Sequence, residues 1–218
     1  MSDTHTYSSD VAFTPAVKAI QTRKGSRGGY ASQEARGGWR TEIDEDLADR
    51  LANTNSFYLA TATADGQPYI QHRGGPKGFV KILDKNTIAF ADYSGNRQYI
   101  TQGNLSENPK AHIFVMDYAH RRRVKIWGEA RVAGSEEDLL RKLMPEGYRA
   151  RPEQAIVFRV SAWDSNCPQH IPRRFEAEDV AAELEQRDRR IAQLEAELAN
   201  MRAATSAASG AQCSNTMP

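Results

Sequence analysis

The sequence predicts a mainly β domain, closed or nearly closed into a barrel, with flanking helices and a long C-terminal helix. First, about seven short segments rich in strand-forming residues lie between residues 57 and 160. Second, most of these segments are joined by short turns, which is typical of antiparallel barrels. Third, apolar residues recur at heptad spacing over residues 176–203.

The composition bounds the function. The chain has 218 residues, of which 39% are hydrophobic, and 29 Lys and Arg balance 28 Asp and Glu. That length fits one compact domain with appendages. Balanced charge creates no overall field that attracts nucleic acid or an acidic membrane, so an anionic ligand must be held by a local cluster.

The cellular compartment is predicted from what the sequence lacks. It has no run of about 18 apolar residues, and its N-terminus lacks the apolar stretch of a signal peptide. The two cysteines, Cys167 and Cys213, form no disulfide framework. We therefore expect a cytoplasmic protein that binds neither membrane nor nucleic acid.

The elements are expected in the following order. Residues 1–42 form an extension, with a short helix within 10–22 and glycine-rich loops at 25–30 and 36–39. A helix follows at 44–53, because Ile43, Leu47 and Leu51 lie four residues apart. Further helices are expected at 96–107 and at 135–143, the latter capped by Ser135. The expected strands are residues 57–63, 68–73, 79–83, 87–91, 111–116, 124–132 and 154–160.

The C-terminal part differs in pattern. A ladder of apolar residues with one charged position runs through residues 176–203, at Val180, Leu184, Arg187, Ile191, Leu194, Leu198 and Met201. Two interpretations stay open: a surface helix packed on its own barrel, or a helix that associates with a partner helix. Residues 204–218 are rich in Ala, Ser and Gly, and we expect them to be disordered.

Residues 68–109 contain the candidate chemistry. Arg73, Lys77 and Lys81 lie on or beside one strand pair, and Arg97 is expected to open a helix, whose amide groups favour an anion. Gly74 would allow the backbone to approach a ligand closely. These features fit a pocket for a phosphorylated ligand, although lysines and arginines on strands are commonly just solvated.

The order of several short motifs resembles the FMN-binding proteins related to pyridoxamine 5'-phosphate oxidase, over roughly residues 43–175. The motifs are residues 57–61, 65–68, 73–80, 90–92, 95–97, 104–105 and 108–111. The segment 163–171 is similar to a C-terminal signature of one branch of that family.

The resemblance implies a split barrel that forms a two-fold homodimer with FMN at each interface. The phosphate-binding cations would be Arg73, Lys77 or Lys81, and Arg97. Residues along the flavin ring and ribityl chain would be Gln71, His72, Asp92, Tyr93, Asn96 and Gln98, with Gly74 and Asn104 completing the matched motifs. Trp163 and Asn166 would reach the flavin of the partner.

The sequence also departs from the oxidase. Gln98 stands where the oxidase has a second cation at the helix start, and its C-terminal substrate-phosphate pattern is missing. We therefore expect an FMN-dependent oxidoreductase that acts on another substrate. The alternatives are a non-catalytic module that binds flavin or haem for sensing or storage, a deazaflavin in place of FMN, and an assembly role for the C-terminal helix. Cys167 and His170 have ligand-like spacing but no second pair, so no metal site is expected.

Overall fold

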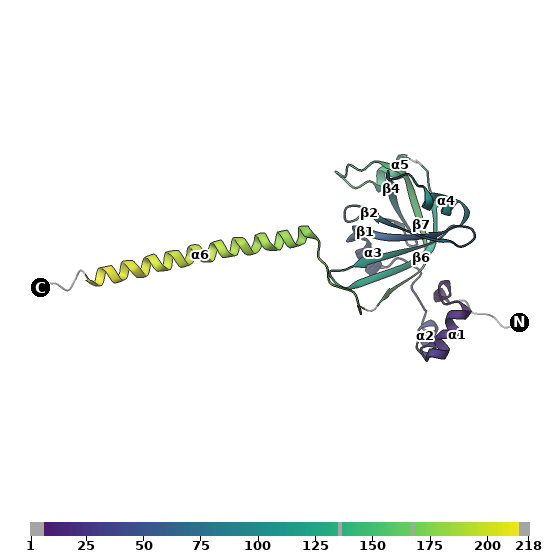
Figure 1. The fold of residues 1–218 in the computed structure, drawn as a ribbon, viewed down its shortest axis with the longest axis horizontal. Helices are drawn as coiled ribbons and strands as arrows, with labels where there is room; N and C mark the ends of the chain where they lie inside the picture. The colour runs from purple at the N-terminus through teal and green to yellow at the C-terminus, as the bar shows by residue number, and fades with distance from the viewer. Residues whose placement is uncertain (1–6, 135–136, 167, 214–218) are drawn as a thin grey trace. The chain divides into compact units, whose positions relative to one another are not determined.

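The computed structural model describes residues 7–134, 137–166 and 168–213. The chain divides into two compact units, residues 1–172 and 173–218. The first unit contains a seven-stranded sheet with helices around it, and the second contains one long helix, α6 (Ala177–Cys213) (Figure 1). This mainly β architecture with flanking helices and a long C-terminal helix confirms the predicted fold class.

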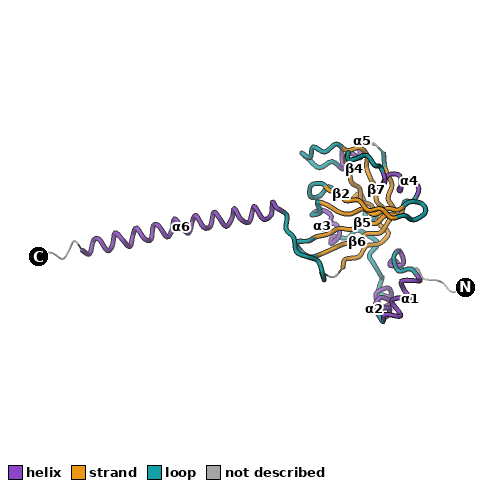
Figure 2. The backbone as a smooth tube through the Cα atoms, viewed as in Figure 1, coloured by secondary structure: helices purple, strands orange, loops and turns teal. Residues whose placement is uncertain are grey.

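All strand pairs in the sheet are antiparallel, and the strand order is β2-β1-β5-β6-β7-β4-β3. Figure 2 shows the strands in orange, gathered into one body. The side chain of Arg73, on the edge strand β2, forms an ion pair with Asp92 on β4, near the opposite edge. The sheet therefore curls until its two ends meet, as a barrel requires. The strands are β1 (Ser56–Ala62), β2 (Pro68–Gly74), β3 (Lys81–Asp84), β4 (Thr87–Tyr93), β5 (Lys110–Asp117), β6 (Arg122–Val132) and β7 (Pro152–Asn166).

The interior of the barrel is filled by alternate residues of the strands. Phe57 and Leu59 of β1, and Ile88 and Phe90 of β4, are at most 1% exposed. A register shift between β6 and β7 falls at Gly128, where a Cβ atom would lie 2.0 Å from the carbonyl oxygen of Arg159. Because the two backbones approach so closely, this bulge requires glycine.

The helices of the first unit lie outside this sheet, and several of them contact it. They are the 3₁₀ turn η1 (Ser8–Val11), α1 (Pro15–Lys24), α2 (Arg27–Ala35), α3 (Glu45–Ala52), α4 (Ile100–Glu107) and α5 (Glu137–Leu143). Helix α3 confirms the expected helix at 44–53, with the Asp44 side chain accepting a hydrogen bond from the backbone N–H of Leu47. The predicted cap Ser135 lies outside the described residues.

Helix α2 corrects one expectation, because it includes residues predicted to form a glycine-rich loop at 25–30. Gly25 does end α1 in the left-handed conformation, with φ of 80°, but the chain becomes helical again at Arg27. The buried Glu34 pairs with Arg27 and accepts a hydrogen bond from Ser9. These contacts, together with the packing of Tyr30 on Phe13, offset the weak helix propensity of the glycines.

Helix α6 begins at the predicted position and continues to Cys213, although residues 204–218 were expected to be disordered. Alanine is the strongest helix former, and this segment is rich in it, which explains the extension. Residues 214–218 lie outside those described. Within the described part of the chain, α6 and the other helices are all too short or too polar to cross a lipid bilayer.

Candidate functional site

A pocket of about 220 Å³ lies where β2 and β4 meet, beside the start of α4. Its walls combine the ends of three strands with the loop that precedes α4. The lining residues are Tyr69, Gln71, Arg73, Asp92, Tyr93, Gly95, Asn96, Arg97, Gln98, Tyr99, Ile100, Thr101, Gln102, Glu153 and Gln154. Nearly all of them are polar, so the pocket is suited to a polar or charged ligand.

Strand alternation explains why these polar side chains face the barrel interior. On β2, Gln71 and Arg73 are paired with the buried Leu59 and Phe57 of β1, so they share that inward face. On β4, Asp92 continues the inward row of Ile88 and Phe90. The inward-facing residues of β2 and β4 therefore lead from the apolar core to the polar pocket, which lies at the mouth of the barrel.

Asp92 connects three strands at this mouth. One carboxylate oxygen pairs with the Nη1 atom of Arg73, and the other accepts a hydrogen bond from Nε2 of Gln154 at 2.9 Å. The side chains of Arg73 and Asp92 are only 12% and 15% exposed. A register irregularity at the end of β4 follows Asp92 directly. Both oxygens thus have fixed partners, and the orientation of Arg73 is set before any ligand binds.

The loop between β4 and α4 corrects the prediction that Arg97 opens a helix. Helix α4 begins only at Ile100, because Arg97 and Tyr99 have positive φ angles of 58° and 54°. The side chain of Asn96 accepts a hydrogen bond from the backbone N–H of Gln98 at 3.3 Å. Non-glycine residues in this left-handed region are uncommon and gather at ligand sites.

Helix α4 holds the pocket from one side through two buried polar contacts. The hydroxyl of Thr101 donates to Oε1 of Gln71 at 2.9 Å, and Nδ2 of Asn104 donates to the hydroxyl of Thr61 at 2.9 Å. Asn104 is 5% exposed and does not line the pocket. This hydrogen bond fixes α4 on β1, and the expected contact of Asn104 with a ligand stays a prediction.

The charges of the pocket are balanced. Arg73 is compensated by Asp92, while Arg97 lies 3.9 Å from Glu153 in a looser pair in which the arginine side chain is 66% exposed. Glu153 in turn accepts a hydrogen bond from the hydroxyl of Ser94 at 2.9 Å. Arg97 is therefore the cation that can move toward an incoming anion at little cost.

Two buried polar atoms of pocket-lining residues have no hydrogen-bond partner in the described structure: Nε of Arg73 and the hydroxyl oxygen of Tyr93. Burial, with a smaller contribution from Tyr148, raises the pKa of Tyr93, so its hydroxyl stays neutral. Both atoms are donors. Because leaving a buried donor unpaired is costly, each is a candidate contact for a ligand or a bound water.

Half of the residues predicted from the sequence converge here, and the others do not. The pocket includes Gln71, Arg73, Asp92, Tyr93, Asn96, Arg97 and Gln98. It does not include His72, Gly74, Lys77 or Lys81. His72 lies on the outer face of β2, where its ring packs edge-on against Tyr58 with centroids 5.7 Å apart.

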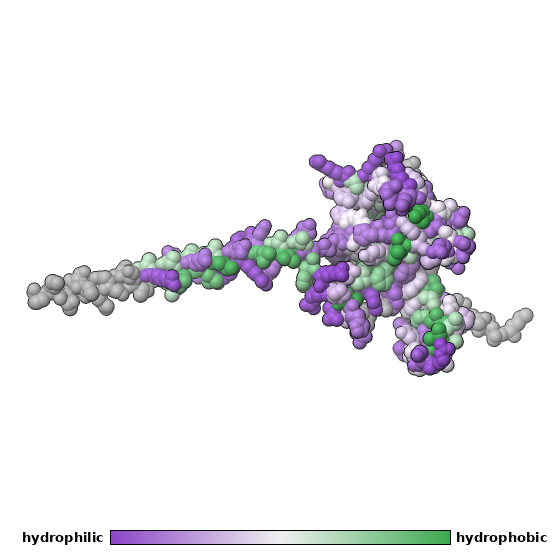
Figure 3. All heavy atoms as spheres, viewed as in Figure 1, coloured by the Kyte–Doolittle hydropathy of each residue, from purple (hydrophilic) through white to green (hydrophobic). Residues whose placement is uncertain are grey.

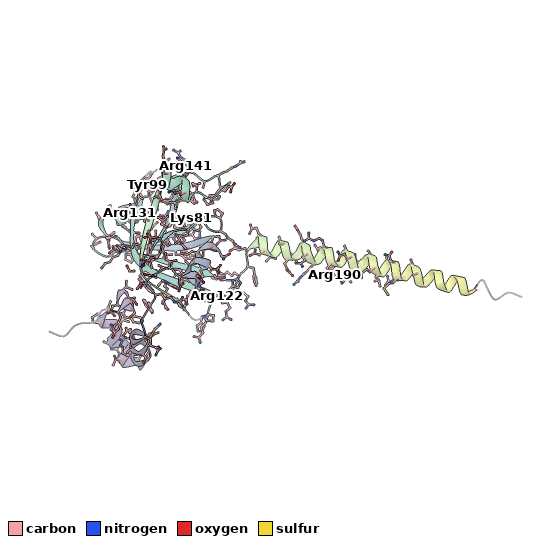
Figure 4. All side chains as sticks on the ribbon, turned by 180° about the vertical axis from the view of Figure 1, so that it is seen from behind. Lys81, Tyr99, Arg122, Arg131, Arg141 and Arg190 are labelled. Carbon is pink, nitrogen blue, oxygen red and sulfur yellow. The ribbon has the colours of Figure 1, made fainter. Side chains whose placement is uncertain are left out.

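The two lysines are also placed away from the pocket. Lys77 is exposed in the turn after β2. Lys81 lies on β3 opposite Ala89, which belongs to the outward row of β4 rather than to the inward row of Asp92. Figure 4 labels Lys81, which lies on β3, and the pocket residue Tyr99, which lies in the loop before α4.

Trp163 is placed in the core of its own barrel and is 1% exposed. Its indole N–H donates to the carbonyl oxygen of Glu42 at 2.8 Å, and the Arg40 guanidinium lies 4.5 Å from its ring centroid. No surface remains for contact with a partner's flavin, which corrects that expectation. Asn166 ends β7 opposite Arg123, and its side chain lies outside the described part of the structure.

The pocket residues that the sequence did not single out include Thr101, Glu153 and Gln154. Gln154 is paired with Asp92 on the neighbouring strand, a register that no local pattern reveals. Within the described residues, no group of three His, Cys, Asp or Glu side chains is arranged to hold a metal ion. Cys167, which had ligand-like spacing with His170, lies outside the described residues.

Comparison with known proteins gives consistent results. Residues 43–167 match the family model described as pyridoxamine 5'-phosphate oxidase. A pyridoxine/pyridoxamine 5'-phosphate oxidase of Bordetella petrii is 28% identical over 149 residues, which cover 68% of this chain and 59% of that protein. This chain thus spans about three fifths of the length of that curated relative.

Two solved structures are more distantly similar. HupZ of Group A Streptococcus has 19% identity and a TM-score of 0.47, with 61% of this chain and 99% of that chain covered. An FMN-binding protein from Syntrophomonas wolfei has 12% identity and a TM-score of 0.43, with 67% and 97% covered.

The family match extends over more than half of the sequence and coincides with the barrel, from two residues before α3 to one residue past β7. It includes the three strands and the loop that form the pocket. The expected split-barrel fold is therefore confirmed, and the chain belongs to the pyridoxamine 5'-phosphate oxidase family.

Proposed function

We propose that this chain is a flavoprotein that binds FMN, with the phosphate held at the loop of residues 95–98 and the polar chain of the cofactor beside Arg73 and Asp92. One observation carries the proposal. Two arginines and several amide side chains from distant parts of the sequence converge in one pocket, in the segment that matches the family. Arginine binds phosphate oxygens strongly because its charged, fork-shaped group can donate two hydrogen bonds at once, and amide side chains add neutral donors.

The residues present fit the phosphorylated tail of such a ligand. Arg97 is largely exposed and only loosely paired with Glu153, so it can rotate onto a phosphate. Arg73 holds a buried donor, Nε, that has no partner among the described residues. Asp92 can accept hydrogen bonds from hydroxyl groups of a ribityl chain. Because Asp92 and Glu153 lower the positive potential, we expect FMN binding to depend strongly on Arg97.

The size of the pocket supports a second protomer. A volume of about 220 Å³ is below the roughly 300–1,000 Å³ that is usual for sites enclosing a whole ligand of this kind. The pocket therefore suits the phosphate and part of the chain, and the flavin ring would extend outside it. A homodimer that covers this ring would complete the site. Light scattering with and without FMN tests this, and a monomer that binds FMN tightly would contradict it.

FMN would supply the redox chemistry, and the residues of the chain would bind and orient it. An oxidoreductase of unknown substrate is the function that this arrangement supports best. The alternative is a module that holds flavin, or haem, without turnover. To separate them, the loaded protein is mixed with a nicotinamide electron donor while its visible absorbance is followed. Bleaching and reoxidation by an acceptor support an enzyme, whereas a bound flavin that no donor reduces supports the alternative.

The central test compares FMN with riboflavin, which lacks the phosphate. The ligand released on denaturation is identified by mass spectrometry, and the apoprotein is then titrated with each compound. We expect Arg97→Ala to weaken FMN binding by about 10- to 100-fold and to leave riboflavin binding unchanged, as loss of a charged contact predicts. Arg131→Ala, at an exposed position of β6 outside the pocket, is the matched control.

Two outcomes would overturn the proposal. One is a colourless protein that does not bind added FMN. The other is an equal loss of FMN and riboflavin affinity in Arg97→Ala, because the arginine would then not contact the phosphate.

A further inference from the structure

Helix α6 carries an apolar stripe that the described structure leaves exposed. Val180, Leu184, Ile191, Leu194 and Leu198 are between 42% and 53% exposed, whereas the apolar residues of the barrel core are at most 9% exposed. In Figure 3, apolar and hydrophilic patches alternate along this helix. The stripe follows spacings of four and three, which keeps it on one side of the helix over about three heptads. Such a pattern fits a partner helix that packs along it.

We propose that α6 pairs with α6 of a second copy of this chain in a parallel, in-register coiled coil. In the heptad notation, Leu184, Ile191 and Leu198 occupy a positions, and Val180 and Leu194 occupy d positions. Two identical helices in register place each of these residues opposite itself. The proposal concerns α6 alone and does not depend on the cofactor of the barrel.

The flanking charges favour a parallel pair. In a parallel coiled coil, each g residue faces the e residue five positions later on the other helix, and opposite charges there stabilise the pair. The g residues Arg190 and Glu197 would face Glu195 and Arg202 of the second copy. By symmetry each pair forms twice. Arg190 projects from α6 in Figure 4, and its guanidinium makes only a long hydrogen bond, 3.4 Å, to Gln193 on the same helix.

The same charges disfavour an antiparallel pair. In that arrangement g residues face g residues and e residues face e residues. When two antiparallel helices align so that residue 184 of one lies opposite residue 194 of the other, Arg190 faces Arg190 and Asp188 faces Asp188. In the same alignment Glu183 faces Glu197. Each of these contacts joins like charges, which is destabilising. The orientation is therefore set by charge, while the apolar stripe provides the attraction.

Arg187 occupies the d position in the middle of the stripe. Its charge compensates Glu183 and Asp188, the g and e residues that would face each other as like charges in the parallel pair. In the structure its Nε lies 3.2 Å from Oε1 of Glu183 on the same helix. In the parallel pair, two Arg187 side chains share one layer, flanked by Glu183 and Asp188 of both helices. These carboxylates would repel one another without the arginines. A polar layer of this kind lowers stability but fixes the register and the orientation.

Disulfide trapping in the full-length protein tests the orientation. In a background that carries Cys167→Ser and Cys213→Ser, Leu184→Cys places a thiol at an a position. We expect rapid formation of a covalent dimer under mild oxidation, because in the parallel pair residue 184 lies opposite itself. An equal mixture of Leu184→Cys and Leu194→Cys chains should give no heterodimer. Ala196→Cys, on the opposite side of α6, is the matched control and should stay monomeric on a denaturing gel.

Two results would overturn the proposal. Cross-linking only in the mixture would show an antiparallel pair, because residues 184 and 194 then face each other. Cross-linking in none of these samples would show that the stripe is not an interface between copies of α6. Cross-linking of Ala196→Cys at the same rate would indicate random collision, which also contradicts the proposal.

The role of Arg187 has a separate test. Arg187→Leu should tighten association of α6 by about ten-fold or more in sedimentation equilibrium, because it replaces a charged layer by an apolar one. In the same variant, the mixture of Leu184→Cys and Leu194→Cys chains should begin to cross-link as the orientation becomes less specific. An association that weakens in Arg187→Leu would show that the arginine does not occupy a core layer.

Discussion

The barrel and α6 use the same apolar residue types with opposite results. Phe90, Ile126 and Phe158 of the barrel are fully buried, whereas Leu184 and Ile191 of α6 are 52% and 53% exposed. In the barrel, apolar residues alternate along short strands, and side chains from strands across the barrel cover them, as Phe90 of β4 covers Phe57 of β1. In α6 they follow a helical period from Val180 to Leu198, within a helix of 37 residues, and the described chain offers no second helix within the same unit. A strand of the barrel thus finds its partner inside the chain, whereas the partner proposed for this helix is a second copy of the chain.

Charged side chains follow the same contrast. The Arg73 side chain is 12% exposed and is fixed by a carboxylate from a distant strand. The Arg187 side chain is 69% exposed and pairs with Glu183 one helical turn away. An exposed pair of this kind contributes only a few tenths of a kcal/mol, roughly 0.3–0.5, while the half-buried pair would leave an uncompensated charge if one partner were removed.

The largest expected difference between the two regions concerns apolar truncation. Phe158→Ala should lower the free energy of unfolding of the barrel by about 3–5 kcal/mol, because it leaves a cavity in a closed core. Leu194→Ala should change it by less than about 0.5 kcal/mol at protein concentrations where α6 is unpaired. Urea unfolding followed by tryptophan fluorescence measures both. Equal losses in the two variants would break the comparison, since the stripe of α6 would then belong to the barrel core.

A second prediction concerns the outer face of the sheet, where His112 packs on Trp127 with ring centroids 4.9 Å apart. Burial, and secondarily the charge of Lys125, lowers the pKa of His112 from 6.5 to about 4. The unfolded chain therefore binds more protons between these values, so stability is complete above about pH 6.5 and falls as the pH drops toward 4. We expect this residue to account for a loss on the order of 2–3 kcal/mol over that window.

The measurement compares urea unfolding of the wild type and of His112→Phe between pH 4 and 7. The variant cannot be protonated, so its stability should fall less steeply, and the difference between the curves isolates the histidine. If stability falls equally with pH in the wild type and in His112→Phe, His112 is not desolvated. The outer face of the barrel would then be as solvated as the surface of α6.

The sequence predicted the fold well because local patterns set it. Each strand was located by its β-branched and aromatic residues, and α3 by Leu47 and Leu51. The errors arose where tertiary contacts override propensity. Helix α2 contains two glycines but is held by the contacts of Glu34, and the start of α4 is delayed by the positive φ angles of Arg97 and Tyr99.

The site was predicted less completely, for a physical reason. Which residues of a strand face inward follows from alternation, and this puts Arg73 and Asp92 at the pocket and His72 on the outer face. The contribution of Gln154 depends on the register between β4 and β7, residues that lie far apart in the sequence. Trp163 was assigned to a ligand by resemblance, whereas its hydrogen bond to Glu42 and its burial give it a structural role.

A third prediction sharpens the contrast between the charged pairs. Asp92→Asn should destabilise the barrel by about 1–3 kcal/mol, because Arg73 keeps its charge in a half-buried position without a carboxylate. Glu183→Gln in α6, which removes the exposed partner of Arg187, should cost less than about 0.5 kcal/mol. Thermal unfolding at low and high salt measures both effects. Salt should reduce only the small one, because exposed charges are screened and half-buried ones much less. A similar salt response in both variants would indicate that Asp92 is as solvated as Glu183.

The smallest expected effect concerns how a short helix is held compared with a long one. Helix α3 has eight residues, too few to be stable alone, so it depends on packing of Leu47 and on its Asp44 cap. Asp44→Ala should cost about 1 kcal/mol in the free energy of unfolding, because the backbone N–H of Leu47 loses its acceptor. Asp44→Asn, which retains a capping oxygen, should restore most of this loss and so separates the cap from the exposed ion pair between Asp44 and Arg40. If Asn and Ala are equally destabilising, the ion pair rather than the cap stabilises α3. The stability of α3 would then depend on its surface charges, just as the orientation of the proposed α6 pair depends on the charges beside its apolar stripe.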